Sequence, residues 1–274
     1  MARSPEGPPP PPAVQKLRVR YAKRGRLRFT SHRDIQRSLE RALRRGDIPM
    51  AYSAGFSPHP KVSYAGAAPT GTASEAEYLE ISVTARCDPA AVRAALDESM
   101  PPGLDILEVV EAGPGGLVER LEASVWRIEL PGVTDESAGA AVATFLAASE
   151  VPVQRMMKNG LRTFDTRSAV HTLAVEQPDR GSVSVVEGSP NVSCAILRAV
   201  VRHTTPAVRP DDVLTALRVV ADLVPPLAPR VTRLAQGPLE SATGAVADPL
   251  EADRLRPARS EPGAGPDTVG SRAP

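Results

Sequence analysis

Residues 51–64 concentrate side chains that can contact a nucleic acid or a partner. The chain has four Phe and four Tyr residues, and three of them, Tyr52, Phe56 and Tyr64, lie in this segment. Two prolines restrict the backbone here, and a rigid loop with aromatic and cationic groups is suited to stacking on bases and contacting phosphates. The residues expected to bind are Tyr52, Ser53, Phe56, Ser57, His59 and Lys61. The alternative is a structural loop whose aromatic side chains cover the edge of a sheet.

A second candidate is the start of the first predicted helix. Ser31 is a good N-cap, and Asp34 three residues later completes a short capping box. The free N–H groups and the helix dipole favour an anion at such an end, so Ser31, His32 and Arg33 are predicted to hold a phosphate. The alternative is an ordinary capped helix with a basic face in solvent.

The second half of the chain contributes a basic hairpin, predicted over 154–162 around an Asn-Gly turn. Lys158, Arg162 and the nearby Arg167 are the predicted RNA- or substrate-binding residues of this half. Arg167 alternates with Asp165 on one strand, and a structural ion pair with neighbouring side chains is the favoured interpretation of these two residues.

Catalytic patterns are weak throughout the sequence. His32 and His59 could form a metal or general-base site with Asp34, Glu75 or Glu77, but no spacing requires it. Neither a phosphate-binding glycine loop nor a nucleophile elbow is present. We therefore predict no catalytic residue, no metal and no cofactor, and the residues favour binding over catalysis.

The cysteine content and hydropathy indicate a cytoplasmic protein. The two cysteines, Cys87 and Cys194, are far apart and form no C-x-x-C pair, so a structural role for both in a reducing compartment is expected. The N-terminus has no apolar signal-peptide core, and no stretch approaches the roughly 18 apolar residues of a membrane span. We expect no membrane partner.

Charge is unevenly distributed along the first half. Between Lys16 and Lys61, 13 basic residues face three acidic ones, whereas nine acidic residues face two arginines between Glu75 and Glu111. This asymmetry favours a polyanionic partner for the basic segment. The alternative is a protein-interaction scaffold in which the charge asymmetry between the first predicted helix and the Glu75–Glu111 segment drives self-association.

Hydrophobic periodicity predicts an α+β fold made of two tandem ferredoxin-like (split βαβ) halves with antiparallel sheets. Each half reads β-α-β-β-α-β, and in the first half the second strand is expected at 26–29. One face of each sheet should stay free for a ligand or the other half. The predicted organisation is a disordered Pro-rich arm (1–14), a first half (15–112), a linker (113–123), a second half (124–237) and a disordered tail (238–274).

The sequence resembles the radical-SAM-linked family, a domain of unknown function found alone or fused behind a cobalamin-binding radical SAM protein. The resemblance, to the separate chain found in actinobacteria, rests on Phe29–His32, Tyr52–Ser63, Glu75–Tyr78, Lys158–Gly160, Phe164–Arg167 and Arg198–Leu214. A radical SAM enzyme needs three clustered cysteines, which this chain lacks. The resemblance therefore implies a role in trans beside such an enzyme.

Together these observations predict an accessory RNA-binding or substrate-presenting protein that acts with a radical SAM or RNA-modifying enzyme. The alternatives are a stand-alone enzyme that uses His32 and His59 with an acidic partner, and the interaction scaffold.

Overall fold

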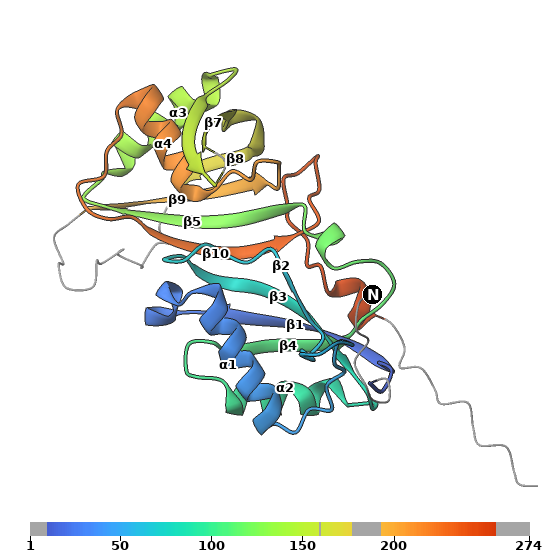
Figure 1. Ribbon diagram of the computed structural model, residues 1–274. Helices are drawn as coiled ribbons and strands as arrows, with labels where there is room; N and C mark the ends of the chain where they lie inside the picture. Colours follow the sequence, from blue (N-terminus) through green and yellow to red (C-terminus); the bar gives the residue numbers. More distant parts are fainter. Residues whose placement is uncertain (1–9, 159, 177–192, 256–274) are drawn as a thin grey trace, which may run out of the picture.

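The computed structural model describes residues 10–158, 160–176 and 193–255 (Figure 1). Residues 1–9 of the predicted arm, Asn159 of the predicted turn and residues 256–274 of the predicted tail lie outside the described residues. The first half contains β1 (Gln15–Lys23), η1 (Gly25–Phe29), α1 (His32–Arg45), β2 (Val62–Ala65), β3 (Ala73–Val83), α2 (Pro89–Ser99) and β4 (Ile106–Glu111).

The second half follows a short linker helix, η2 (Val118–Arg120). It contains β5 (Ala123–Pro131), α3 (Asp135–Ala147), β6 (Pro152–Met157), β7 (Gly160–Asp165), η3 (Arg167–Ala169), β8 (Val170–Val175), β9 (Cys194–Arg202), α4 (Pro210–Ala221) and β10 (Arg230–Gly237). A last helix, α5 (Glu251–Arg254), ends the described chain. None of the helices in the described ranges is long and apolar enough to cross a bilayer.

The core of the first half forms between alternate residues of the strands and the apolar stripe of α1. Leu17, Val19 and Tyr21 of β1 are buried together with Ile35 and Leu39 of α1. Spacings of three and four residues place the apolar side chains of α1 on one side, so its charged side chains face outward. α2 packs beside α1 on the same core.

The strand predicted at 26–29 is wrong, because these residues form the 3-10 helix η1. β1 already pairs with β3 along one edge and with β4 along the other, so no edge remains for a hairpin partner. Gly25, at a φ of +54°, turns the chain away from the sheet toward the start of α1.

The two halves share one sheet, where the sequence predicts a separate antiparallel sheet in each. The order is β4-β1-β3-β10-β5-β9-β8, and β2 also pairs with β3. β10 joins β3 in parallel at two residue pairs, Thr232↔Ala73 and Arg233↔Ser74, while every other pairing is antiparallel. When only the strands of this sheet are counted, so that β6 and β7 are left out, both halves have the order fourth, first, third, second.

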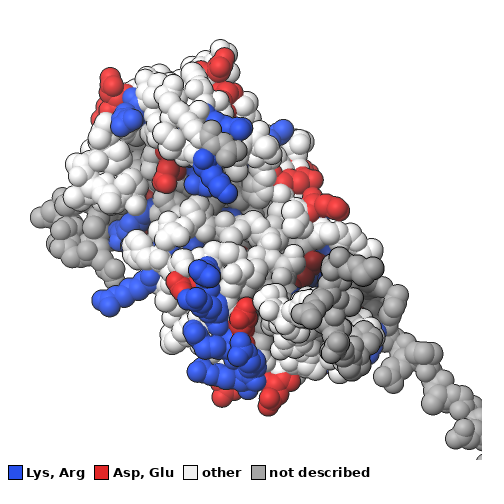
Figure 2. All heavy atoms as spheres, in the orientation of Figure 1, with Lys and Arg blue, Asp and Glu red and all other residues white. Residues whose placement is uncertain are grey.

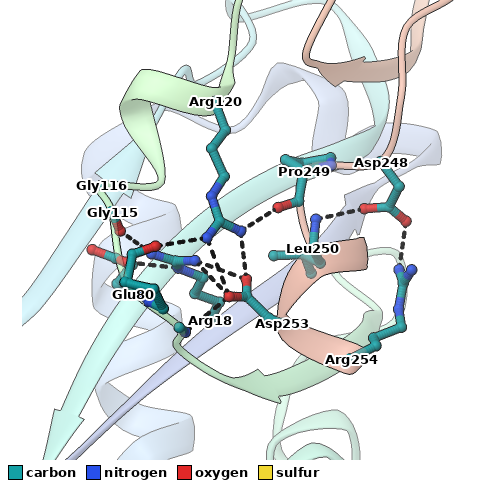
Figure 3. A network of polar contacts seen from close by, with 12 residues as sticks. Arg18, Glu80, Gly115, Gly116, Arg120, Asp248, Pro249, Leu250, Asp253 and Arg254 are labelled. Carbon is teal, nitrogen blue, oxygen red and sulfur yellow. Dashed lines mark hydrogen bonds and ion pairs between the residues drawn. The ribbon is translucent and has the colours of Figure 1, made fainter. Parts of the chain in front are cut away.

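The disordered tail predicted from residue 238 is wrong for residues 238–255. This segment, called the C-terminal strap below, forms a bridge between Leu239 and Val246 and buries Leu250 completely. Asp253 of α5 accepts hydrogen bonds from Arg18 in β1 and from Arg120 in the linker (Figure 3). The strap is ordered because a buried carboxylate and an apolar side chain attach it to the sheet.

The strap and the linker also cover the face of the first-half strands that lies opposite α1 and α2. Tyr78 of β3 and Val110 of β4 are buried there against Leu117, Leu121 and Leu250. The expected free face is therefore closed in the first half, and a binding surface has to be sought on the helices and loops.

Candidate nucleic-acid interface

Most of the cations on β1 and the following turn are neutralised within the molecule. Arg18 is 1% exposed and forms ion pairs with Glu80 and Asp253. Arg24 bridges Glu75 and Asp105, and the ammonium group of the buried Lys23 donates to the carbonyls of Ala68 and Pro69. Three acidic residues between Glu75 and Glu111, namely Glu75, Glu80 and Asp105, thus pair with cations of β1 and the following turn inside one chain. The scaffold hypothesis depends on the charge of the first helix and stays a prediction.

Exposed arginines are concentrated on α1. Five arginines point away from its buried stripe, and they are defined here as the α1 arginine face: Arg33, Arg37, Arg41, Arg44 and Arg45. Only two carboxylates of the helix oppose them, with Arg37 3.5 Å from Asp34 and Arg44 3.8 Å from Glu40. Figure 2 shows the resulting band of blue over the lower half of the molecule, where Figure 1 places α1.

The start of α1 is capped as predicted. The Ser31 hydroxyl accepts a hydrogen bond from the Asp34 amide at 3.3 Å and donates one to the Asp34 carboxylate at 2.7 Å. This carboxylate supplies the negative charge that the helix dipole favours at this end. His32 and Arg33 are exposed beside the cap. Phosphate binding by these residues stays a prediction.

The 51–61 segment is a short hairpin that interrupts the edge of the sheet between Met50 and β2. Tyr52 pairs with Pro60, the Ser53 amide donates to the His59 carbonyl at 2.9 Å, and the His59 amide donates to the Ser53 hydroxyl at 3.0 Å. Gly55, at a φ of +130°, allows the turn at the tip. Phe56 next to it is 71% exposed. The hydrogen bonds between Ser53 and His59 therefore fix the two arms of the hairpin, and Phe56 at its tip extends into solvent.

His32 connects α1 to the strand that leaves the hairpin. Its ring meets the ring of Tyr64 in β2 edge to face, with 4.8 Å between the centroids. Burial and the nearby Glu40 carboxylate raise the pKa of Tyr64, so its hydroxyl stays protonated at neutral pH. The first turn of α1 thus contacts the strand that follows the 51–61 hairpin. The predicted residues of these two segments are exposed or partly exposed: Ser31, His32, Arg33, Tyr52, Ser53, Phe56, Ser57, His59 and Lys61.

The carboxylates needed for a catalytic histidine site are engaged elsewhere. Glu75 pairs with Arg24, and Glu77 pairs with Arg233 of β10 in the interior. Within residues 10–158, 160–176 and 193–255, no group of three His, Cys, Asp or Glu side chains is placed to hold a metal ion. Cys87 and Cys194 are free thiols, and burial raises the pKa of each.

The predicted residues of the second half separate into two kinds. Lys158, directly after β6, and Arg162 on β7 are exposed. Arg167 instead donates to the carbonyls of Val170 at 3.1 Å and Leu146 at 3.5 Å, with its guanidinium over the Phe145 ring. Asp165 accepts the amides of Val151, Arg167 and Ser168 rather than forming the favoured ion pair. Arg167 and Asp165 therefore hold the turn after β7.

Four of the five arginines of the α1 arginine face, and the aromatic residue Phe29, were not predicted from the sequence as site residues. Arg33, Arg37, Arg41 and Arg45 recur at intervals of four, a spacing that places them along one side of a helix and could have revealed the face from the sequence. Phe29, just before α1, is 60% exposed. The guanidinium carbon of Arg28 lies over the Phe29 ring, 4.8 Å from the ring centroid. No pattern in the sequence marked Phe29 as exposed.

The fold and this surface define an α+β protein with a basic helical face and an exposed aromatic hairpin. The family model of an uncharacterized protein conserved in bacteria, DUF2344, matches residues 16–210, and the chain belongs to this family. No curated protein matches the chain. A solved structure titled "Crystal Structure of an Unknown Protein from Galdieria sulphuraria" matches at 16% identity over 80% of this chain and 96% of that one. Its TM-score of 0.23 carries no argument about fold or function.

Proposed function

We propose that the protein is an accessory RNA-binding module. The observation that carries this proposal is the α1 arginine face, where five arginines are opposed by two carboxylates of the helix. At the start of this helix, His32 contacts Tyr64 in the strand that follows the exposed aromatic hairpin. Arginines along a helix can follow a phosphate backbone, and exposed aromatic rings can stack on unpaired bases. Phosphate contacts supply most of the affinity in such an interface, so binding has to weaken steeply with salt.

Neutralising part of the α1 arginine face should weaken RNA binding and flatten its salt dependence. In the variant Arg37→Gln/Arg41→Gln, loss of two phosphate contacts should lower the slope of log affinity against log salt by about 1.4 for a single-stranded RNA. The affinity at about 50 mM salt, where phosphate contacts are strong, should fall by tenfold or more. Filter binding of total tRNA and of an oligouridylate over a salt series measures both quantities.

The matched control is Arg86→Gln/Arg198→Gln, which removes the same charge from exposed positions outside α1. It should leave the slope nearly unchanged if the α1 arginine face makes the contacts. An equal loss of RNA affinity in both variants would show that binding depends only on net charge, and the α1 arginine face would then not be the binding site. No affinity of the unaltered protein for tRNA, rRNA or oligouridylate at about 50 mM salt would overturn RNA binding itself.

Replacing Phe56 by alanine tests the hairpin separately from the charge. The ring is 71% exposed, so the change should leave the free energy of unfolding within about 0.5 kcal/mol. Loss of one base–aromatic stack should cost about 1–3 kcal/mol of binding free energy without changing the salt slope. The Val118→Ala variant, at an equally exposed apolar position in η2, is the control. Unchanged RNA affinity in Phe56→Ala would remove the hairpin from the interface.

We further infer that the module acts in trans with an RNA-modifying enzyme, and the resemblance to the radical-SAM-linked family suggests a radical SAM enzyme in the cytoplasm. The chain's two cysteines are too few for the three ligands of a radical SAM cluster, so the catalytic centre would belong to the partner. We also infer that each half derives from a ferredoxin-like unit, which is supported by the common strand order of the two halves. A tagged pulldown with mass spectrometry from the host, with the Arg37→Gln/Arg41→Gln variant as a comparison, tests for the partner.

A further inference from the structure

β6 and β7 form a two-stranded ribbon that stands apart from the large sheet. Among the described residues, the two strands pair only with each other. The base of the ribbon is fixed to the second half, because Val153 is buried and Arg155 forms an ion pair with Asp212 at the start of α4. Arg155 also donates to the Ala207 carbonyl at 2.9 Å. The base is therefore held in place, while the outer end of the ribbon extends beyond the core.

The outer end of the ribbon exposes two apolar side chains that lie opposite each other. Met156 of β6 is in register with Leu161 of β7, so their side chains lie on the same face of the ribbon. Met156 is 72% exposed and Leu161 is 58% exposed. Gln154 and Thr163, the next cross-strand pair on that face, are also exposed. An apolar pair on a projecting ribbon is a surface that can be inserted against a flat partner group such as a base.

Two cations flank this apolar pair. Lys158 follows Met156 by two residues at the end of the ribbon, whereas Arg162, in register with Arg155, lies next to Leu161 on the opposite face. Both are exposed, and neither forms an ion pair with any carboxylate in the described parts of the chain. By contrast, Arg127, Arg198 and Arg230 on β5, β9 and β10 of the large sheet each pair with Glu129 or Glu176.

The ribbon faces the same way as the α1 arginine face. In Figure 2, blue side chains lie over the region that β6 and β7 occupy in Figure 1, in the same view as the band over α1. A polyanion bound along α1 and extending toward the second half would therefore meet the ribbon on the face that is seen there.

We propose that the β6–β7 ribbon is a second contact for the same RNA, and that the ligand is a folded RNA that reaches across both halves. This inference rests on the proposed RNA-binding function. Met156 and Leu161 pack against an exposed base face at an unpaired nucleotide or a stem end, while Lys158 and Arg162 contact the flanking phosphates. The unpaired cations favour RNA over an apolar protein segment as the occupant.

The test compares two RNAs and two variants of the full chain. The RNAs are tRNA, which is long and folded, and an oligouridylate of about 6 nucleotides, near the lower end of the site size of one module. The ribbon variant combines Met156→Ser, Leu161→Ser, Lys158→Gln and Arg162→Gln, all at exposed positions. The first-half variant is Arg37→Gln/Arg41→Gln, and Val118→Ser controls for removing an exposed apolar side chain.

The ribbon variant should bind tRNA at least tenfold more weakly than the unaltered protein and bind the short oligouridylate equally well. The first-half variant should lose affinity for both RNAs. If the ribbon variant keeps full tRNA affinity while the first-half variant loses it, the ribbon serves a protein partner and this inference is wrong, although RNA binding stands. Equal loss for both RNAs would also overturn a separate second contact. If neither RNA binds the unaltered protein, the proposed function fails as well. Thermal unfolding of each variant checks that the fold is intact.

Discussion

Replacing Glu77 with alanine is expected to destabilise the fold by about 3–5 kcal/mol, because it leaves buried cations without their carboxylate. Glu77 forms an ion pair with Arg233 of β10 and accepts a hydrogen bond from the Ala68 amide at 3.1 Å. The side chains of Glu77, Arg233 and the neighbouring Lys23 are all nearly inaccessible to solvent. The lost ion pair joins β3 of the first half to β10 of the second. Urea unfolding of the whole chain therefore measures the decrease in the free energy of unfolding.

Lys23 provides a pH test of this explanation. Burial lowers the pKa of Lys23, and Glu77 opposes that effect while Arg233 adds to it. Removing Glu77 should therefore lower the pKa of Lys23 further. Between the lowered folded pKa and the unfolded pKa of about 10.4, the unfolded chain binds more protons than the folded one. The stability of Glu77→Ala should therefore rise as the pH increases through this range toward 10. A deficit that does not change with pH would contradict a role for buried charge.

The matched control is Glu75→Ala, two residues earlier on the same strand. Glu75 pairs with Arg24, whose side chain is almost half exposed, and surface pairs of this kind contribute about 1 kcal/mol or less. If Glu77→Ala costs no more than Glu75→Ala, the buried pair does not hold the two halves together.

The local elements of this fold follow largely from the sequence. Alternating Leu17, Val19 and Tyr21 predicted β1, and Ser31 and Asp34 predicted the start of α1, because these signals depend only on neighbours in the chain. The sequence did not reveal which charges neutralise one another. Arg18 meets Glu80 because the antiparallel register of β1 and β3 sets these two residues opposite each other. Composition showed two blocks of opposite charge, but their pairing is a property of the sheet.

The candidate site shows the same division. Residues 51–64 were selected as a binding loop from their residue types, and the Ser53–His59 hydrogen bonds that make a hairpin within this segment are local. Most arginines of the α1 arginine face were not predicted as binding residues. Their importance depends on which other arginines form ion pairs in the folded protein, and the sequence does not show this. Arg167 was selected for its charge, yet its guanidinium is held by the carbonyls at the end of α3 and the start of β8. Charge predicts a contact only where the fold leaves that charge unpaired.

The C-terminal strap is the element for which composition was most misleading. Its prolines, glycines and scattered charges are typical of disorder, and its order depends on partners more than 130 residues away in the chain. The free energy that orders the strap comes from Leu250 and from the buried carboxylate of Asp253, which meets two arginines that cannot be recognised as its partners from sequence spacing.

Replacing Asp253 with alanine is expected to cost about 3 kcal/mol of stability. The carboxylate is completely buried and accepts hydrogen bonds from Arg18 at 2.8 Å, Arg120 at 2.8 Å and the Gly113 amide at 2.8 Å (Figure 3). Arg18 would keep Glu80 as a partner, so the loss of stability should lie near the lower end of the about 3–5 kcal/mol that breaking a buried ion pair costs. Urea unfolding measures the loss, and Glu251→Ala, an exposed change in the same short helix, should stay within about 0.5 kcal/mol.

The pH dependence of this loss identifies its cause. Burial alone would raise the pKa of Asp253, but the hydrogen bonds from Arg18, Arg120 and Gly113 hold it below its ordinary value. A carboxyl group with a lowered folded pKa stabilises the protein above its unfolded pKa of about 3.9, and this contribution disappears as the pH falls through the folded pKa. The difference in stability between the unaltered protein and Asp253→Ala should therefore be constant near neutral pH and shrink below about pH 4. A constant difference throughout would mean that the alanine acts by removing packing, and the ionised carboxylate would then not be what orders the strap.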